Sequence, residues 1–262
     1  MARYPVPPAT PRSTLATVFL VAVSLLFGGA CRGDLPETPV RTTTAGGSWT
    51  APSAAQAADR DRALLRIVSA IPGGSRLDLF VDGQKLGDAL EYKAITPYME
   101  VPSGRHAIRL RPAGMDTADP LADESQQLRA GRYYTAVIMP GDEGRPAAAI
   151  RVFDDPMDVP DEGRASLRVV HAAADAGRVD VHVQGRDDPL ASALDFQAGS
   201  AFTTIQPPAI VELRPAQRTE TMLRLADLRL SAGGMYTVIV IGRTRIEPPL
   251  ETLVLEDRIS RQ

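Results

Sequence analysis

Two stretches of the chain, 102 residues apart, have closely related sequences. LRIVSAIPGGSRLDLFVDG (65–83) aligns without a gap on LRVVHAAADAGRVDVHVQG (167–185), and 8 of the 19 positions are identical. The similarity continues in the same order through the segments 86–101 and 190–205, 128–139 and 230–241, and 151–155 and 253–257. A repeat of this length predicts two units of one fold, which we place at residues 63–155 and 164–258.

Each copy has the pattern of a β protein. Leu77, Leu79 and Val81 alternate with more polar neighbours, and 179–183 repeats the alternation, which is typical of a strand with one buried face. Asp82-Gly83 is a tight-turn pair that predicts a hairpin. With about seven short strands per copy, we expect an all-β chain of two tandem immunoglobulin-like β-sandwiches.

A leucine and a tyrosine recur six residues apart in both copies. The pairs are Leu128 with Tyr134 and Leu230 with Tyr236, and each tyrosine opens a strand-like segment rich in Thr, Val and Ile. This spacing resembles the tyrosine corner of β-sandwiches, in which the hydroxyl group bonds to backbone a few residues upstream. We therefore expect both hydroxyl groups to make that hydrogen bond.

Three motifs carry a family resemblance. They are an R-[IV]-V-x-A start, an [LV]-D-[LV]-x-V-x-G strand and a late A-G-x-x-Y-T strand, and each occurs in both copies between Leu65 and Asp257. The chain resembles a bacterial envelope family catalogued as a domain of unknown function (number 4397), which is often found in tandem on lipoproteins. The resemblance implies a fold and an envelope location, and it supplies no catalytic residues.

The N-terminus has the order of a secretory signal peptide. Arg3 and Arg12 precede the 13-residue apolar run 15–27, and small residues follow. The single cysteine, Cys31, comes next, and GGAC resembles the lipobox of bacterial lipoproteins, although glycine stands where leucine is usual. We therefore expect cleavage after residue 30 and lipidation of Cys31, so that membrane lipid holds the protein in the cell envelope.

Two features extend this prediction. Arg32 follows the cysteine in place of the aspartate that resembles an inner-membrane retention signal, which favours the outer membrane if the cell has two membranes. Residues 31–62 are rich in Pro, Thr, Ser and Ala without an apolar period, which indicates a flexible tether.

Composition and motifs narrow the function. The formal net charge of −3 provides no basic surplus for nucleic acid. The sequence has no G-x-S-x-G, H-E-x-x-H, P-loop or dinucleotide glycine motif. We therefore expect a non-catalytic structural or binding module without a cofactor, whose partner is an unknown envelope protein or surface ligand.

Two groups of residues offer alternatives. The junction between the copies is acidic, and carboxylates there suit calcium, which would make the protein a calcium-dependent adhesion or ligand-binding protein: Asp154, Asp155, Asp158, Asp161 and Glu162. In the second copy, His171, Asp180 and His182 have side chains that bind metals, which leaves a metal-dependent envelope hydrolase as a remote third hypothesis. Asp180 and His182 are i, i+2 neighbours, expected on the face opposite Val179, Val181 and Val183.

Three charged positions recur in both copies, which favours a structural role for them over a catalytic or metal-binding role. They are Arg66 and Arg168, Arg76 and Arg178, and Asp78 and Asp180, whereas neither histidine recurs. A charged residue that is retained in two diverged copies is expected to have the same role in each copy. We expect these arginines to bond an aspartate or loop carbonyl groups across strands.

Overall fold

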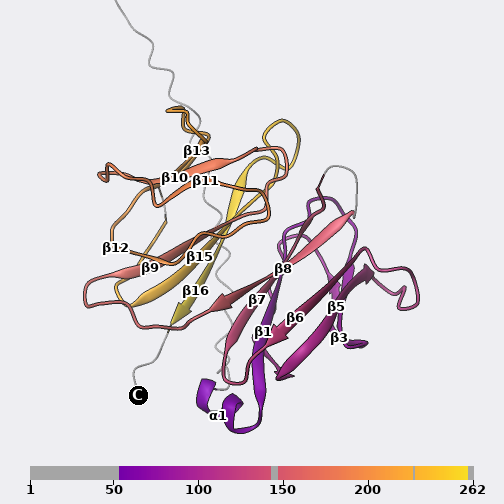
Figure 1. Ribbon diagram of the computed structural model, residues 1–262. Helices are drawn as coiled ribbons and strands as arrows, with labels where there is room; N and C mark the ends of the chain where they lie inside the picture. Colours follow the sequence, from indigo (N-terminus) through magenta and orange to yellow (C-terminus); the bar gives the residue numbers. More distant parts are fainter. Residues whose placement is uncertain (1–52, 143–146, 227, 259–262) are drawn as a thin grey trace, which may run out of the picture. The chain divides into compact units, whose positions relative to one another are not determined.

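The computed structural model describes residues 53–142, 147–226 and 228–258, all within the compact unit Glu37–Gln262. The regular elements among those residues are strands, apart from one short helix (Figure 1). No helix among them is long and apolar enough to cross a membrane. The predicted signal peptide, Cys31 and most of the predicted tether lie outside the described residues.

The first copy forms two four-stranded sheets. One sheet has the order β4-β1-β7-β8 and the other has the order β3-β2-β5-β6. We call this unit the first sandwich, and Figure 1 shows it in indigo to magenta. Its strands are β1 (Arg62–Ser69), β2 (Leu77–Val81), β3 (Gln84–Leu90), β4 (Met99–Pro102), β5 (Gly104–Pro112), β6 (Ala122–Leu128), β7 (Tyr133–Pro140) and β8 (Ala148–Asp155).

The second copy repeats this arrangement strand for strand. Its sheets have the orders β12-β9-β15-β16 and β11-β10-β13-β14, so each strand corresponds to the one eight positions earlier. We call this unit the second sandwich, drawn in orange to yellow in Figure 1. Its strands are β9 (Ala165–His171), β10 (Val179–Val183), β11 (Ala191–Leu194), β12 (Thr203–Ile205), β13 (Val211–Pro215), β14 (Leu223–Leu225), β15 (Gly234–Ile241) and β16 (Glu251–Arg258).

The all-β, two-sandwich prediction is confirmed, but the strand order is not that of an immunoglobulin domain. An immunoglobulin constant domain places its first two strands side by side in a four-stranded sheet that faces a three-stranded one. Here β1 and β2 lie in different sheets, and β1 pairs in parallel with β7. The physical reason is that β1 and β7 are nearly continuous apolar runs, which are stable in the middle of a sheet covered on both faces.

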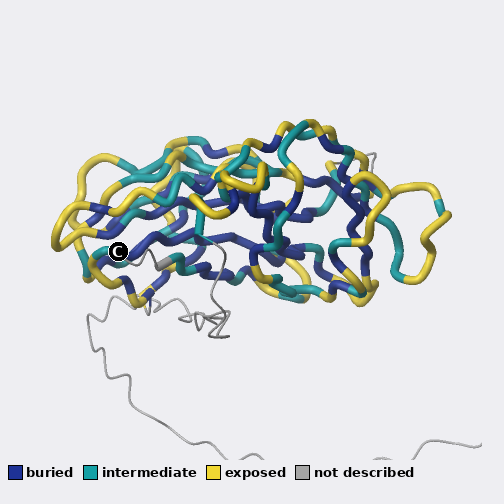
Figure 2. The backbone as a smooth tube through the Cα atoms, turned by 90° about the horizontal axis from the view of Figure 1, so that it is seen from below, coloured by how far each residue is buried: buried dark blue, intermediate teal, exposed yellow. Residues whose placement is uncertain are grey.

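Alternation along the strands fills a separate core in each sandwich. In β1, Ala63, Leu65 and Ile67 point into the first core, and in β10, Val179 and Val181 point into the second. Buried residues follow the strands, and exposed residues gather in the loops (Figure 2). The predicted face of β10 is therefore confirmed.

Two local predictions are also confirmed. The Asp82-Gly83 turn joins β2 to β3 with both residues at positive φ, 49° and 83°, as a two-residue hairpin requires. The hydroxyl group of Tyr134 accepts a hydrogen bond from the Arg129 N–H at 3.1 Å. That of Tyr236 accepts one from the Ser231 N–H at 2.9 Å, so both tyrosine corners are present.

The helix α1 (Ala54–Asp59) lies inside the range that composition assigns to the tether. Ser53 and Gln56 form a capping box that satisfies N–H groups at its start. The helix packs on the first sandwich beside Gly131, where a Cβ atom would lie 2.9 Å from the Ala58 Cβ atom. The ordered body therefore begins before β1.

Replacing Gly131 by alanine should separate helix docking from backbone strain. Gly131 and its counterpart Gly233 both have positive φ, 70° and 80°, but an added Cβ atom at Gly233 meets nothing within 4 Å. In both variants, strain at positive φ should lower the free energy of unfolding by about 1 kcal/mol, and Gly131→Ala alone should also displace α1. Hydrogen exchange should show lost protection in 54–59 for Gly131→Ala only. Equal loss in both variants would contradict this docking.

Candidate functional site

The two sandwiches share a buried apolar layer. Residues of β1, β7, β9, β15 and β16 that point away from their own cores meet in it. This layer consists of Val68, Ala70, Val137 and Met139 from the first sandwich and Val170, Ala172, Ile239, Ile241, Leu253 and Leu255 from the second. The central strands are therefore buried on both faces, which explains their continuous apolar sequences.

Arg66 lies buried beside this layer, 6% exposed, and reaches into the second sandwich. Its two terminal nitrogens each donate a 2.8 Å hydrogen bond to Asp257, one to each carboxylate oxygen. Its Nε–H group donates to the Thr135 hydroxyl group at 2.8 Å. This planar, two-point pairing is the strongest form of arginine–carboxylate contact.

Arg168, 3% exposed, contacts the equivalent aspartate and threonine in the opposite direction, but it binds the aspartate through one nitrogen and its Nε–H group has no hydrogen-bond partner among the described residues. Its Nη2 atom donates to Asp155 of the first sandwich at 2.6 Å and to the Thr237 hydroxyl group at 2.9 Å. Its Nη1 atom donates to the carbonyl oxygen of Asp154 at 2.9 Å. Each sandwich thus gives an arginine to the other and takes one from it.

An aromatic ring covers each guanidinium group. Tyr98 lies 4.6 Å from Arg66 and Phe202 lies 4.5 Å from Arg168, measured from the guanidinium carbon to the ring centre. The Tyr98 hydroxyl group also donates to Asp155 at 2.9 Å, which links the two ion pairs. Stacking on a ring favours a cation that has lost its water.

The charge of the cluster is balanced internally. Burial alone would lower the pKa of Arg66, but Tyr98 and the carboxylates of Asp257 and Asp155 raise it above its usual value. Arg66 therefore stays charged, and two arginines face two aspartates. We call the group formed by Arg66, Asp155, Arg168 and Asp257 the paired-arginine cluster.

A second pair of equivalent residues crosses between the sandwiches near the edge of the layer. Lys93 and Gln197 occupy matching positions, with positive φ of 71° and 65°. Lys93 donates to Glu251 at 2.7 Å, and Gln197 donates to the carbonyl oxygen of Pro140 at 2.9 Å. The exchange of contacts thus extends beyond the paired-arginine cluster.

The recurring aspartates Asp78 and Asp180 hold backbone rather than a ligand. Asp78 accepts hydrogen bonds from the Ala89 and Gly114 N–H groups, at 2.7 and 3.0 Å. Asp180 accepts equivalent bonds from Ala193 and Gln217, at 2.6 and 3.0 Å. All four donors have positive φ, so each aspartate stabilises an irregular stretch of backbone at the same place in its copy.

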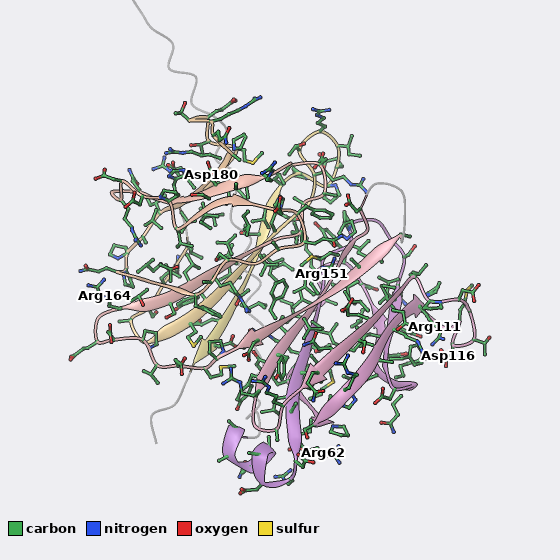
Figure 3. All side chains as sticks on the ribbon, in the orientation of Figure 1. Arg62, Arg111, Asp116, Arg151, Arg164 and Asp180 are labelled. Carbon is green, nitrogen blue, oxygen red and sulfur yellow. The ribbon has the colours of Figure 1, made fainter. Side chains whose placement is uncertain are left out.

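The structure does not bring His171, Asp180 and His182 together. β9 and β10 belong to different sheets. His171 is fully buried, its Nε2 atom is 2.7 Å from the Gly177 carbonyl oxygen, and burial lowers its pKa. Asp180 and His182 lie on the opposite side of β10 from the core (Figure 3 labels Asp180). His171 therefore does not join Asp180 and His182, because its side chain is buried within the second sandwich.

The five junction carboxylates are not gathered either. Asp155 is buried in the paired-arginine cluster, and Asp154 pairs with Arg132 at 2.5 Å. Asp158, Asp161 and Glu162 are exposed on the linker between β8 and β9. Among the described residues, no three His, Cys, Asp or Glu side chains are grouped as a metal site requires. The geometry therefore gives no support to the calcium and hydrolase hypotheses.

Sequence reasoning found part of the paired-arginine cluster. It singled out Arg66 and Arg168 and expected an aspartate partner across strands. It missed Asp257 as a functional position and assigned Asp155 to calcium. A usable signal was present, because an acidic residue ends both copies at matching positions, and Thr135 and Thr237 also recur.

A known family model matches a little under half of the chain. The family model named "Domain of unknown function (DUF4397)" matches residues 63–182. Residues 63–182 are therefore similar to that family, and the two sheet-pair units of the structure are consistent with tandem copies, although the family model matches once. No curated protein matches the chain.

Several solved structures resemble the chain weakly. An alpha-glucan-binding streptococcal virulence factor is 11% identical, with a TM-score of 0.23, over 67% of this chain and 91% of that one. The family 26 carbohydrate-binding module of Eubacterium rectale Amy13K, in complex with maltoheptaose, is 10% identical, with a TM-score of 0.23, over 76% and 98%. Similarity at this level carries no argument about a ligand.

Removing one partner of the paired-arginine cluster should destabilise the protein strongly. Asp257→Ala leaves Arg66 buried without its bidentate partner, which costs about 3–5 kcal/mol in free energy of unfolding. Glu91→Ala is the matched control, because it breaks the Arg76–Glu91 pair whose side chains are both 63% exposed, and it should cost less than about 1 kcal/mol. Urea unfolding measures both, and equal costs would contradict the structural role.

The contribution of Asp180 to stability should depend on pH. Hydrogen bonds from Ala193 and Gln217 lower its pKa below the usual 3.8. The stabilisation is therefore complete above 3.8 and is lost as the pH falls through the folded-state pKa. Asp180→Asn should be less stable than the parent at neutral pH, with a gap that narrows in acid. A gap that stays constant in thermal unfolding across this range would be the contrary result.

Proposed function

We propose that the chain is a non-catalytic envelope protein, anchored through acylated Cys31, whose two sandwiches act as one rigid structural or binding body. The paired-arginine cluster is the observation that carries this proposal. Two modules that exchange buried charges across a shared apolar layer are held in one relative orientation, because separating them would expose the layer and unpair both arginines.

The use of chemically capable side chains supports a non-catalytic role. His171 is buried against the Gly177 carbonyl oxygen, and His106 bonds to Asp82 and to the Pro102 carbonyl oxygen. Asp78 and Asp180 hold backbone N–H groups. Side chains that a catalytic site would need are thus engaged in maintaining the fold.

The N-terminal sequence supports the location. An acid-free basic start, a 13-residue apolar run and a lone cysteine after small residues suit export followed by lipidation. Two or more acyl chains on Cys31 would hold the body at a membrane stably. Arg32 favours the outer membrane in a cell with two membranes.

Fractionation of the envelope tests the anchor. Cys31→Ala removes the acylated thiol, so we expect the protein to move from the membrane fraction to the soluble fraction and to lose metabolic labelling with palmitate. Arg32→Ala is the control and should remain in the membrane fraction. If Cys31→Ala stays membrane-bound in the same amount as the parent, the anchoring proposal is wrong.

A further inference from the structure

The two sandwiches differ at one place where their strands otherwise match. In the first sandwich, the side chain of His106 fills the space between the β2–β3 turn and the start of β5. Its Nδ1 atom lies 2.7 Å from the Asp82 carboxylate, its Nε2 atom lies 2.8 Å from the Pro102 carbonyl oxygen, and it is 5% exposed. The imidazole ring closes this end of the first sandwich.

The second sandwich lacks this plug. The N–H group of Asp82 donates to the Ala107 carbonyl oxygen, and that of Gln184 donates to Ile210, which makes Gln184 the counterpart of Asp82. Ala209, one residue before Ile210, therefore stands where the first sandwich has His106. A methyl group replaces an imidazole ring, and the carboxylate that bonded to the ring is also replaced.

A depression of about 560 Å³ lies at this place in the second sandwich. Pro207 and Pro208 contribute its accessible apolar surface, and the buried residues Val183, Ile205 and Ala209 lie beneath. Its polar lining comes from Arg164, just before β9, from the turn after β10, from β12 and from the β12–β13 connection: Gln184, Arg186, Thr204 and Gln206. Figure 3 labels Arg164.

The polar lining is available to a ligand. Arg164 and Arg186 are exposed, and neither guanidinium group has an ion pair or a hydrogen bond within the described part of the chain. Two guanidinium groups at one depression suit a carboxylate, which each can bind in a planar fashion. The amides of Gln184 and Gln206 both donate and accept, which suits neighbouring hydroxyl groups.

We propose that this depression binds a carboxylate-bearing sugar unit, with the carboxylate on Arg164 and Arg186 and the hydroxyl groups on the two glutamines. The apolar surface of Pro207 and Pro208 would contact the C–H face of the sugar ring. The proposal rests on the binding role proposed above and assigns it a ligand class.

The site is specific to the second sandwich. Arg62 matches Arg164, but the first sandwich has Gln84 where the second has Arg186, and His106 occupies the space. The acidic pairs that flank the two arginines, Asp161-Glu162 and Asp187-Asp188, do not line the depression. The first sandwich is therefore closed at this place and the second is open.

Calorimetric titration of the full chain in detergent with trigalacturonic acid tests the proposal. We expect saturable binding, with maltotriose, which lacks carboxylates, not binding and inorganic phosphate binding at least about tenfold more weakly. Absence of trigalacturonate binding overturns the site. Phosphate binding as tight as trigalacturonate binding overturns the sugar assignment.

A pair of variants tests the location. Ala209→His with Gln184→Asp rebuilds the plug of the first sandwich, a combination this fold already accommodates, and should raise the dissociation constant by about tenfold or more. Arg164→Gln should do the same, whereas the matched control Arg62→Gln should leave it unchanged. Binding unaffected by the rebuilt plug, or weakened equally by Arg62→Gln, overturns the site.

The fractionation result separates the two proposals. A chain that depends on Cys31 for membrane attachment but binds no trigalacturonate keeps the proposed envelope role and loses this site. If the protein binds trigalacturonate but Cys31→Ala does not change its membrane attachment, the binding site is supported and the anchoring proposal is wrong.

Discussion

The rest of the structure depends on the exchange of buried charge between the two sandwiches. Arg66 pairs with Asp257 and Arg168 pairs with Asp155, so each module satisfies a cation that the other has buried. A buried ion pair contributes little net stability compared with apolar packing, but an unpaired member is expensive. Such pairs therefore act against wrong arrangements more than they stabilise the right one. The apolar layer around them provides the affinity, and the arginines fix how the two sandwiches meet.

The exchange is reciprocal, as in a two-fold symmetric dimer, but here the two units belong to one chain. In such an interface, a residue of one subunit meets its partner on the other, and the same contact occurs a second time in reverse. Here the contacts of Arg66 and Arg168 obey this rule, whereas Lys93 and Gln197 occupy matching positions but bind partners that do not correspond. Elsewhere the two copies differ, and Ala209 in the position of the histidine plug is one such difference.

The fold was largely predictable from local pattern because its determinants lie near each other in sequence. Three features each depend on a few neighbouring residues: the alternation in β2 and β10, the Asp82-Gly83 turn and the two tyrosine corners. The repeat shows that the same local patterns occur twice. The strand order and the shared layer depend on which faces of the central strands meet. An apolar run alone does not indicate which other element packs against that run. For the same reason, His171 suggested chemistry in the sequence, whereas its burial between sheets makes it a packing residue. In the sequence, Asp155 suggested a calcium ligand, whereas in the structure it pairs with the guanidinium group of Arg168.

Scanning calorimetry of the full chain tests the central claim most directly, because it asks whether the two sandwiches unfold together. If the paired-arginine cluster and its apolar layer join them into one body, the protein unfolds in a single transition whose calorimetric and van't Hoff enthalpies agree. Two separable transitions, each with the enthalpy of one sandwich, would contradict the account.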